Sequence, residues 1–186
     1  MQSIPIVIYR KWIKNDSASL LAQLIFNNTN WDQPKAKVYG KSYLVPRLTS
    51  FLAIKGVTYT YSGVVHKGEG WPSWFVPLLR EVQDYCDVDF NGCLLNLYRN
   101  GEDCMGWHAD NEKVLDSSKP IASISLGAKR DFLLKNLMSL EKYSFSLNNG
   151  DLLLMKRDCQ RHWIHSLPKR KKVKEPRINL TFRKYL

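Results

Sequence analysis

The chain has 186 residues, of which 44% are hydrophobic and 24% are charged. This length suits one ordinary domain, and the composition excludes a disordered chain. No apolar run approaches the roughly 18 residues that a membrane-spanning helix requires. A secretory signal has basic residues ahead of its apolar segment, and residues 1–9 have none ahead of their apolar patch. We therefore expect one domain, residues 1–186, with no membrane partner, and, since the four cysteines show no disulfide pattern, an intracellular protein.

Positive charge is concentrated at the end of the chain. Lys and Arg number 28 against 17 Asp and Glu, a net charge of +11. Residues 169–186 hold eight basic residues and one acidic residue, a net charge of +7, so the rest of the chain carries only +4. Such a balance favours a polyanionic partner such as nucleic acid. On charge alone, a basic protein without such a partner is an equal alternative.

Two segments show helical spacing. The first begins at a candidate cap, Asp16 or Ser17, and ends at residues 27–28. The second fits residues 73–86, with Pro77 near its first turn, where proline is tolerated. Apolar stripes are formed by Leu20, Leu21, Leu24 and Ile25 in the first segment and by Trp74, Leu78, Val82 and Tyr85 in the second.

From Gly92 onward the pattern changes to short strands separated by turn residues. The predicted strands cover residues 93–99, 120–126, 130–135, 142–147, 151–155 and 177–182. Many short strands at close spacing indicate a β-sandwich or jelly roll. The fold class predicted is therefore mainly β with flanking helices, and the two helices should cover one face. The four cysteines form no C-x-x-C pair and are expected to be free thiols.

His108 and Asp110 form an H-x-D pair. In an extended segment, residues i and i+2 point to the same side, so an imidazole and a carboxylate would converge. His162 or His165 could supply a third ligand. Two histidines and one carboxylate on one face are typical of non-haem Fe(II) oxygenases. An isolated H-x-D pair is more often a set of hydrogen-bonded polar residues, so this motif alone does not decide the chemistry.

The last predicted strand alternates strictly. Its polar positions are Arg177, Asn179, Thr181 and Arg183, and its apolar positions are Ile178, Leu180 and Phe182. Two inward arginines would be costly to desolvate without anionic partners. A small diacid would satisfy them, because guanidinium groups bind carboxylates bidentately. Asn96 and Tyr98 repeat the same alternation. The alternative is a half-exposed strand with solvated arginines.

Taken together, these motifs resemble the AlkB family of Fe(II)- and 2-oxoglutarate-dependent nucleic-acid dealkylases. The resemblance covers about residues 36–186 and combines H-x-D, a later histidine and R-x-N-x-T-x-R. It is closest to the animal branch that repairs double-stranded DNA. Residues 36–41 resemble that branch's finger hairpin, residues 56–63 resemble its substrate-lid strand, and the basic run at residues 168–173 also fits.

The resemblance implies a double-stranded β-helix (jelly-roll) core, with residues 1–63 forming an N-terminal helix and a nucleotide-recognition lid. It implies Fe(II) with 2-oxoglutarate and dioxygen as co-substrates. By the family motif, iron would be held by His108, Asp110 and His165. The residues that would hold 2-oxoglutarate are Asn96, Tyr98, Arg177, Asn179, Thr181 and Arg183. Arg177 and Tyr98 would take the distal carboxylate, and Arg183 would lie nearer the metal.

The same resemblance implies a monomer that demethylates 1-methyladenine and 3-methylcytosine in DNA, a direct-reversal repair, on double-stranded and also single-stranded substrates. A base inside a duplex must be flipped out to be reached. Tyr39 would fill the vacated stack, and Tyr61 would stack the flipped base against His108. The implied substrate-binding residues are Tyr39, Gly40, Lys41, Tyr59, Tyr61, Ser62, Asn111 and Glu112. Asn111 stands where that branch has a second acid. Without the resemblance, Tyr39 would be interpreted as a buried hairpin aromatic, and Tyr59 and Tyr61 could equally be core aromatics.

Two other functions stay open. One is an oxygenase of the same chemistry that acts on RNA, protein or a small molecule. The other is a non-catalytic, basic nucleic-acid-binding sandwich. The run at residues 169–174 could contact phosphates or serve as a nuclear-localisation signal. The expected compartment is therefore the nucleus in a eukaryote and the cytoplasm in a bacterium.

Overall fold

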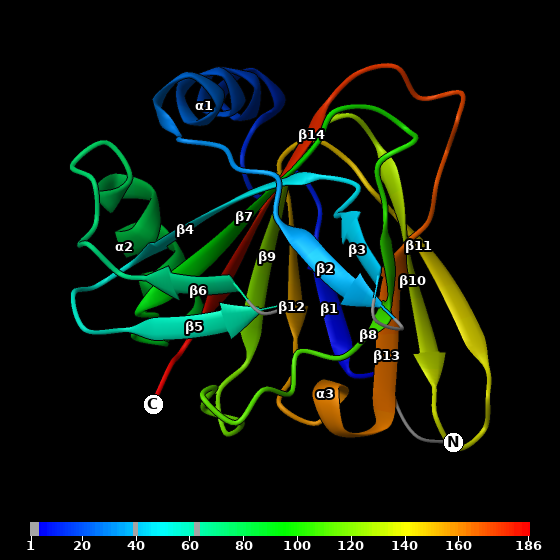
Figure 1. Ribbon diagram of the computed structural model, residues 1–186. Coiled ribbons are helices and arrows are strands. Elements are labelled where there is room, and N and C mark those ends of the chain that lie inside the picture. The colour runs from blue at the N-terminus through cyan, green and yellow to red at the C-terminus, as the bar shows by residue number, and fades with distance from the viewer. Residues whose placement is uncertain (1–3, 39–40, 62–63) are drawn as a thin grey trace.

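The computed structural model describes residues 4–38, 41–61 and 64–186, and the side chains among them outside residues 36–41 and 61–64. Its main element is a six-stranded antiparallel sheet with the strand order β1-β12-β9-β14-β7-β4 (Figure 1). Its strands are β1 (Ile6–Tyr9), β12 (Asp151–Met155), β9 (Ile121–Gly127), β14 (Arg177–Arg183), β7 (Gly92–Tyr98) and β4 (Leu48–Ala53).

A second, four-stranded antiparallel sheet faces the first, in the order β11-β10-β13-β8. It consists of β11 (Lys142–Leu147), β10 (Arg130–Asn136), β13 (Trp163–Leu167) and β8 (Met105–His108). The short helix α3 (Cys159–His162) leads directly into β13. Two separate hairpins pair β2 (Lys35–Val38) with β3 (Lys41–Leu44) and β5 (Thr58–Tyr61) with β6 (Val64–Lys67).

The space between the two sheets is filled differently at its two ends. At one end an apolar cluster that includes Leu153 from the large sheet and Phe132, Leu134 and Trp163 from the small sheet closes the interior. Further along, a cavity is lined by polar residues of both sheets, among them Arg177 and His165. This arrangement confirms the mainly β, jelly-roll fold class. It also leaves a polar cavity between the two sheets.

Both long helices cover the outer face of the six-stranded sheet, as predicted. Helix α1 (Asn15–Asn28) and helix α2 (Val76–Cys86) bury residues in the same cluster as Leu95, Leu180 and Phe182. The predicted stripe of α1 was right for Leu21 and Ile25, which pack in this cluster, and wrong for Leu20 and Leu24, which are 67% and 41% exposed. The residues that face the sheet are Ala18, Leu21, Ala22 and Ile25. This set also has helical spacing, and it lets small residues sit closest to the sheet.

The beginning of α1 also differs from the prediction. The helix starts at Asn15, so Lys14 is its N-cap residue and makes no side-chain capping hydrogen bond. Asp16 lies inside the first turn, where its charge favours the helix N-terminus without capping it. Helix α2 starts at Val76, three residues after the predicted start, with Pro77 in its first turn as expected.

The six predicted strands all form, and each differs from its expected range by at most one residue at either end. Strands β1, β4, β8 and β13 were not predicted. Two of them, β1 and β4, belong to the segment 1–63 that was expected to be a helix and lid. They are the two edge strands of the six-stranded sheet, so part of that segment belongs to the scaffold. The four cysteines are free, as predicted.

No helix in the ranges described is long and apolar enough to cross a membrane.

The N-terminal segment is held against the turn between β11 and β12. Gly150 has a φ of +81°, and a Cβ there would overlap the carbonyl oxygen of Ile13. The neighbouring Asp151 is 1% exposed. Its carboxylate accepts hydrogen bonds from Arg10 Nη1 at 2.6 Å, Lys11 N at 3.0 Å and Asn148 N at 2.9 Å. One buried carboxylate thus joins two segments far apart in sequence.

We expect Asp151→Ala to lower the free energy of unfolding by about 3 kcal/mol, because these three donors and a fourth, Asn148 Nδ2 at 3.3 Å, lose a buried acceptor. Burial alone raises the pKa of Asp151, but the hydrogen bonds from Asn148, Lys11 and Arg10 lower it below its ordinary value of 3.8. The carboxylate therefore stabilises the fold at pH above about 4, and this stabilisation is lost as the pH falls through the folded pKa.

Denaturant unfolding between pH 2 and pH 6 measures both effects. Asp151→Asn should lose less stability on acidification than the wild type does. Asp84→Asn, at an exposed position on α2, is the matched control and should behave as the wild type. An equal acid dependence in the wild type and Asp151→Asn would contradict this assignment.

Candidate active site

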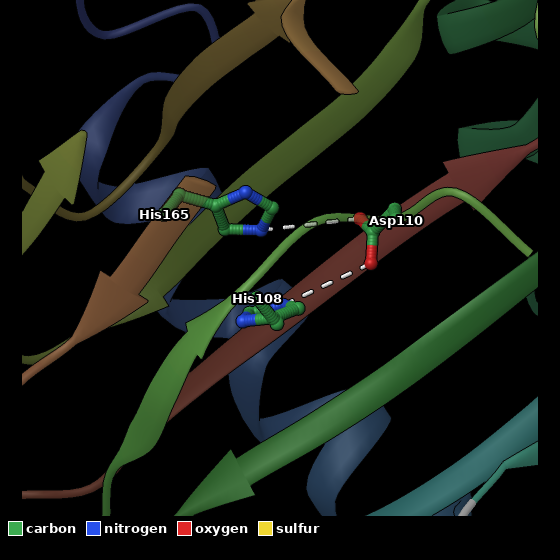
Figure 2. A group of neighbouring side chains, drawn as sticks. All are labelled: His108, Asp110 and His165. Carbon is green, nitrogen blue, oxygen red and sulfur yellow. Dashed lines mark ion pairs between the residues drawn. The ribbon is translucent and has the colours of Figure 1, made fainter. Parts of the chain in front are cut away.

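His108, Asp110 and His165 come together at the inner face of the small sheet (Figure 2). His108 ends β8, and its register partner on β13 is His165, so pairing of the two strands places the imidazoles side by side with ring centroids 4.1 Å apart. Asp110 follows two residues later. Its Oδ1 lies 3.8 Å from His108 Nε2 and its Oδ2 lies 4.0 Å from His165 Nε2. All three ligand atoms lie within 4.8 Å of one another.

The protonation states of these groups suit a metal cation. Burial raises the pKa of Asp110, but Arg183, His165 and His108 outweigh it and bring that pKa down to about 2. Burial, with His108 and Arg183 nearby, lowers the pKa of His165 to about 3. His108 Nδ1 lies 2.9 Å from the carbonyl oxygen of Gly106, which can only accept, so in the neutral ring Nε2 is the nitrogen that carries the lone pair. The cluster therefore offers an anionic oxygen from Asp110, a neutral imidazole from His165 and the Nε2 side of His108.

His162 does not belong to this cluster. It is exposed at the end of α3, three residues before His165. Spacing alone left the two histidines equivalent, and the register of β13 against β8 brings His165 to the other two side chains.

The alternating residues of β14 separate as predicted. Ile178, Leu180 and Phe182 enter the apolar cluster under the helices. The four polar residues face the cavity and are all buried, with Arg177 2% and Arg183 4% exposed. This burial excludes the alternative of a half-exposed strand with solvated arginines. The neighbouring strand β7 adds Asn96 and Tyr98, which are the register partners of Asn179 and Arg177.

Arg177 is a buried cation with no carboxylate partner among the described residues, and a second guanidinium, that of Arg130, lies near the same Tyr98 ring. Its Nη2 donates to Ser125 Oγ at 2.8 Å, and its guanidinium lies 5.4 Å from the centroid of the Tyr98 ring. Its Nε has no hydrogen-bond partner among the described residues. Burial lowers the pKa of Arg177 to about 10. A buried guanidinium without a carboxylate partner is costly, so this end of the cavity suits an anionic ligand.

Arg183 has a different partner. Its Nη2 lies 2.8 Å from Asp110 Oδ1, and its guanidinium lies 5.8 Å from the centroid of the Tyr59 ring. Burial would lower the pKa of Arg183, but the Asp110 carboxylate raises it above its ordinary value. The two arginines of β14 are therefore not equivalent, since Arg183 is paired with a carboxylate and Arg177 has no carboxylate partner among the described residues.

The remaining polar residues of the cavity bond mainly to one another. Asn179 Nδ2 donates to Ser123 Oγ at 2.8 Å and to the Ile124 carbonyl oxygen at 3.0 Å. Thr181 Oγ1 donates to Asn179 Oδ1 at 3.1 Å, and Asn96 Oδ1 accepts from Arg47 Nε at 2.7 Å. This network holds the cavity wall in one arrangement.

Sequence analysis missed several residues of the site. Ser123 and Ser125 project from β9 beside β14, and their alternation with Ala122, Ile124 and Leu126 was a usable signal. Arg47 and Gln160 contact Asn96 and Asp110 from distant segments, and local spacing carried no signal for either.

The substrate-binding predictions are only partly within the described residues. Tyr59 is 1% exposed, packs with Phe51 and Tyr185, lines the cavity, and donates its hydroxyl to Glu112 Oε1 at 2.8 Å. Asn111, which precedes Glu112 in the sequence, is exposed. Tyr39, Gly40 and Ser62 lie outside the described residues. Lys41 begins β3 and Tyr61 ends β5, and their side chains also lie outside the description.

Comparison with known proteins agrees with this geometry. The family model of the 2OG-Fe(II) oxygenase superfamily matches residues 5–183. The chain belongs to this superfamily. Membership implies Fe(II), 2-oxoglutarate and dioxygen, and the two-histidine, one-carboxylate cluster fits the metal.

Within the superfamily, the chain belongs with the AlkB homologues. It is 42% identical to DNA oxidative demethylase ALKBH2 of Mus musculus over 164 residues, which cover 82% of this chain and 67% of the relative. The same enzyme of Bos taurus is 40% identical (82% and 58%), and that of Homo sapiens is 39% identical (82% and 61%). This chain thus spans about three fifths of the length of these relatives.

A solved structure named "The structure of OsALKBH1" shares the fold. Its TM-score is 0.69 with 17% sequence identity, and the match covers 99% of this chain and 100% of that chain.

The Arg183–Asp110 pair gives a prediction for the metal-free protein. Asp110→Asn removes the only carboxylate within 4.0 Å of the Arg183 guanidinium among the described residues. We expect it to lower the free energy of unfolding by about 3 kcal/mol in the presence of a chelator, because a buried charge is left uncompensated.

Chemical denaturation measures this loss. His108→Asn is the control, because the His108 side chain is 25% exposed and should cost less than about 1 kcal/mol. Equal losses in the two variants would contradict the role given to the ion pair.

Proposed function

We propose that this chain is an Fe(II)- and 2-oxoglutarate-dependent DNA oxidative demethylase. Its substrates would be 1-methyladenine and 3-methylcytosine, and the reaction would restore the unmodified bases. The observation that carries the proposal is a pair of neighbouring sites in one buried cavity. One is the His108–Asp110–His165 cluster, and the other is the unpaired cation Arg177. The ALKBH2 relatives supply the substrate class.

In this proposal His108, Asp110 and His165 hold Fe(II), which when bound supplies the activation of dioxygen. The keto acid would chelate the metal at one end and reach Arg177 with its other carboxylate, beside Tyr98 and Ser125. Asn96, Asn179, Thr181 and Arg183 would form the walls between these ends. Burial of the whole slot would exclude water from the co-substrate.

The overall reaction balances without a further reagent. 2-Oxoglutarate, dioxygen and the methylated base would yield succinate, carbon dioxide and a hydroxymethyl base. The hydroxymethyl group would then leave as formaldehyde and restore the base. The protein's own contribution would be to orient the base and the co-substrate.

The base would enter beside Tyr59 and Glu112. The Tyr59 hydroxyl is bonded to Glu112 Oε1, so the carboxylate is held next to Tyr59, which lines the cavity, and its second oxygen has no hydrogen-bond partner among the described residues. An acid in this position suits a cationic lesion such as 1-methyladenine or 3-methylcytosine. We propose Tyr59, Tyr61, Ser62, Asn111 and Glu112 as base contacts, and Tyr39, Gly40 and Lys41 as contacts to the duplex.

The basic loop at residues 169–174 would contact the phosphate backbone. The loop is held in place by contacts to its own protein. Arg130 Nη2 donates to the Pro168 carbonyl oxygen at 2.8 Å, Arg170 Nε pairs with Asp131 Oδ2 at 2.6 Å, and Arg170 N donates to the Gly101 carbonyl oxygen at 2.7 Å. Lys171, Lys172 and Lys174 remain exposed. A fixed loop with exposed lysines loses little conformational freedom when it binds phosphates.

We further propose that residues 1–186 act as a single-domain monomer on double-stranded DNA, and also on single strands. DNA as substrate would place the protein in the nucleus of a eukaryote or the cytoplasm of a bacterium.

A product assay tests this function. With Fe(II), 2-oxoglutarate and air, we expect loss of the methyl group and release of formaldehyde from both single- and double-stranded oligonucleotides that carry one 1-methyladenine. His108→Ala should abolish both. Tyr39→Ala should slow turnover of the duplex more than of the single strand, because only the duplex leaves a gap to fill.

Two outcomes of this assay would favour the other functions. Succinate formation without demethylation of DNA would favour an oxygenase for RNA, protein or a small molecule. DNA binding with no succinate formation at all would favour a non-catalytic nucleic-acid-binding protein.

Arg177→Met tests the proposed 2-oxoglutarate site. Loss of a charge-assisted contact worth about 1.5–3 kcal/mol should raise the KM for 2-oxoglutarate at least about tenfold. The kcat at saturating co-substrate should change less, because Arg177 lies away from the metal ligands. Arg80→Met, an exposed arginine on α2, is the matched control. An unchanged KM in Arg177→Met would contradict the assignment.

A further inference from the structure

Gln160, on the short helix α3, contacts the main chain of Asp110. Its Oε1 accepts the hydrogen bond of Asp110 N at 2.8 Å. Its Nε2 donates to Met155 Sδ at 3.4 Å, so both ends of the side-chain amide are occupied. Gln160 itself touches neither His108 nor His165 in any hydrogen bond found among the described residues. Its effect on the site would therefore pass through Asp110.

Asp110 needs such a partner because it lies just beyond a strand. β8 ends at His108, and the last register pair with β13 is His108 with His165. Asp110 is only 6% exposed and lies in irregular structure, so its N–H has neither a strand partner nor ready access to water. A buried N–H without an acceptor is costly. Gln160 Oε1 replaces the carbonyl that a continued β-ladder would have supplied.

This hydrogen bond joins the two chain segments that carry the three clustered side chains. His108 and Asp110 lie in one segment, and Gln160 lies only five residues before His165 in the other. Asp110 is thus held at two points, by Gln160 at its backbone and by Arg183 at its carboxylate, 2.8 Å from each. Arg183 alone would leave the backbone of this irregular segment unsupported.

We propose that Gln160 is a positioning residue for the metal site. It holds the backbone of Asp110 at the place where the carboxylate meets both imidazoles, and so raises the affinity of the site for a divalent cation. This inference rests on the proposed function only in requiring that His108, Asp110 and His165 bind metal. Loss of a partner that orients a metal ligand typically costs 10- to 100-fold in metal affinity.

Three variants separate this role from simple packing. Gln160→Met keeps the length of the side chain without an acceptor, Gln160→Asn keeps the amide but is one methylene shorter, and Gln160→Glu keeps an oxygen acceptor at the original length. Gln23→Met, at an exposed position on α1, is the matched control. The metal-free full chain is titrated with Co²⁺, a redox-stable substitute for Fe²⁺, by calorimetry. The melting temperature is recorded with and without Co²⁺.

We expect Gln160→Met and Gln160→Asn to weaken Co²⁺ binding about tenfold or more and to reduce the rise in melting temperature on adding Co²⁺. Gln160→Glu should stay within about threefold of the wild type, and Gln23→Met should equal it. The Asn variant carries the test if the Met variant does not fold.

Two results would overturn the inference alone. One is an unchanged affinity in whichever of the Met and Asn variants folds, and the other is an affinity in Gln160→Glu as weak as in those two. A wild-type chain that binds no Co²⁺ would instead refute the proposed function, and the inference with it.

Discussion

The ion pair between Arg183 and Asp110 is the interaction on which the interior depends. Both side chains are buried, one on the central strand β14 and the other just after β8 in the opposite sheet. A pair of this kind is costly to desolvate and is retained only where its geometry is close and other groups complete it. Here it joins the two sheets at the wall of the cavity. The cavity can be polar at this end because the Arg183 guanidinium and the Asp110 carboxylate compensate each other's charge.

The asymmetry between the two arginines of β14 follows from that pair. Arg183 is paired with Asp110, while Arg177, six residues away on the same face, contacts a serine hydroxyl and an aromatic ring and lies near a second guanidinium, that of Arg130. The strand therefore presents one cation that is paired with a carboxylate and one that is not, and both retain buried nitrogens without a hydrogen-bond partner among the described residues. The internal hydrogen bonds of Asn179, Thr181 and Ser123 lie between them and fix the wall. A diacid that reaches from the metal cluster to Arg177 would place a carboxylate beside this guanidinium. Among the described residues that line this wall, Arg177 is the one charged side chain without an oppositely charged partner.

A third buried arginine, Arg130, supports the basic loop that we propose contacts DNA. Arg130 is as deeply buried as the cavity arginines, yet it binds three main-chain carbonyl oxygens, those of Asn100, Asp103 and Pro168. It thereby joins the loop after β7 to the basic loop that precedes β14. Arginine can serve here because its five donors reach several acceptors at once. Buried arginines thus have three roles in this molecule. Arg183 forms an ion pair between the two sheets, Arg177 is proposed to bind an anionic ligand, and Arg130 holds two loops together.

Much of this protein could be predicted from the sequence, because the informative patterns were local. Strict alternation along residues 177–183 determined which side chains face the helices and which face the interior, and the H-x-D spacing determined that His108 and Asp110 converge. Tertiary structure decided what depends on register and on distant segments. It selected His165 over His162, paired Arg183 with Asp110 while leaving Arg177 open, and brought Arg47 and Gln160 to the site. It also assigned β1 and β4 to the edges of the main sheet and turned α1 so that Ala18 and Ile25 face it. The physical reason is that side-chain spacing within a strand or helix is set by backbone geometry. Which strands pair, and in which register, is set by the packing of the whole chain.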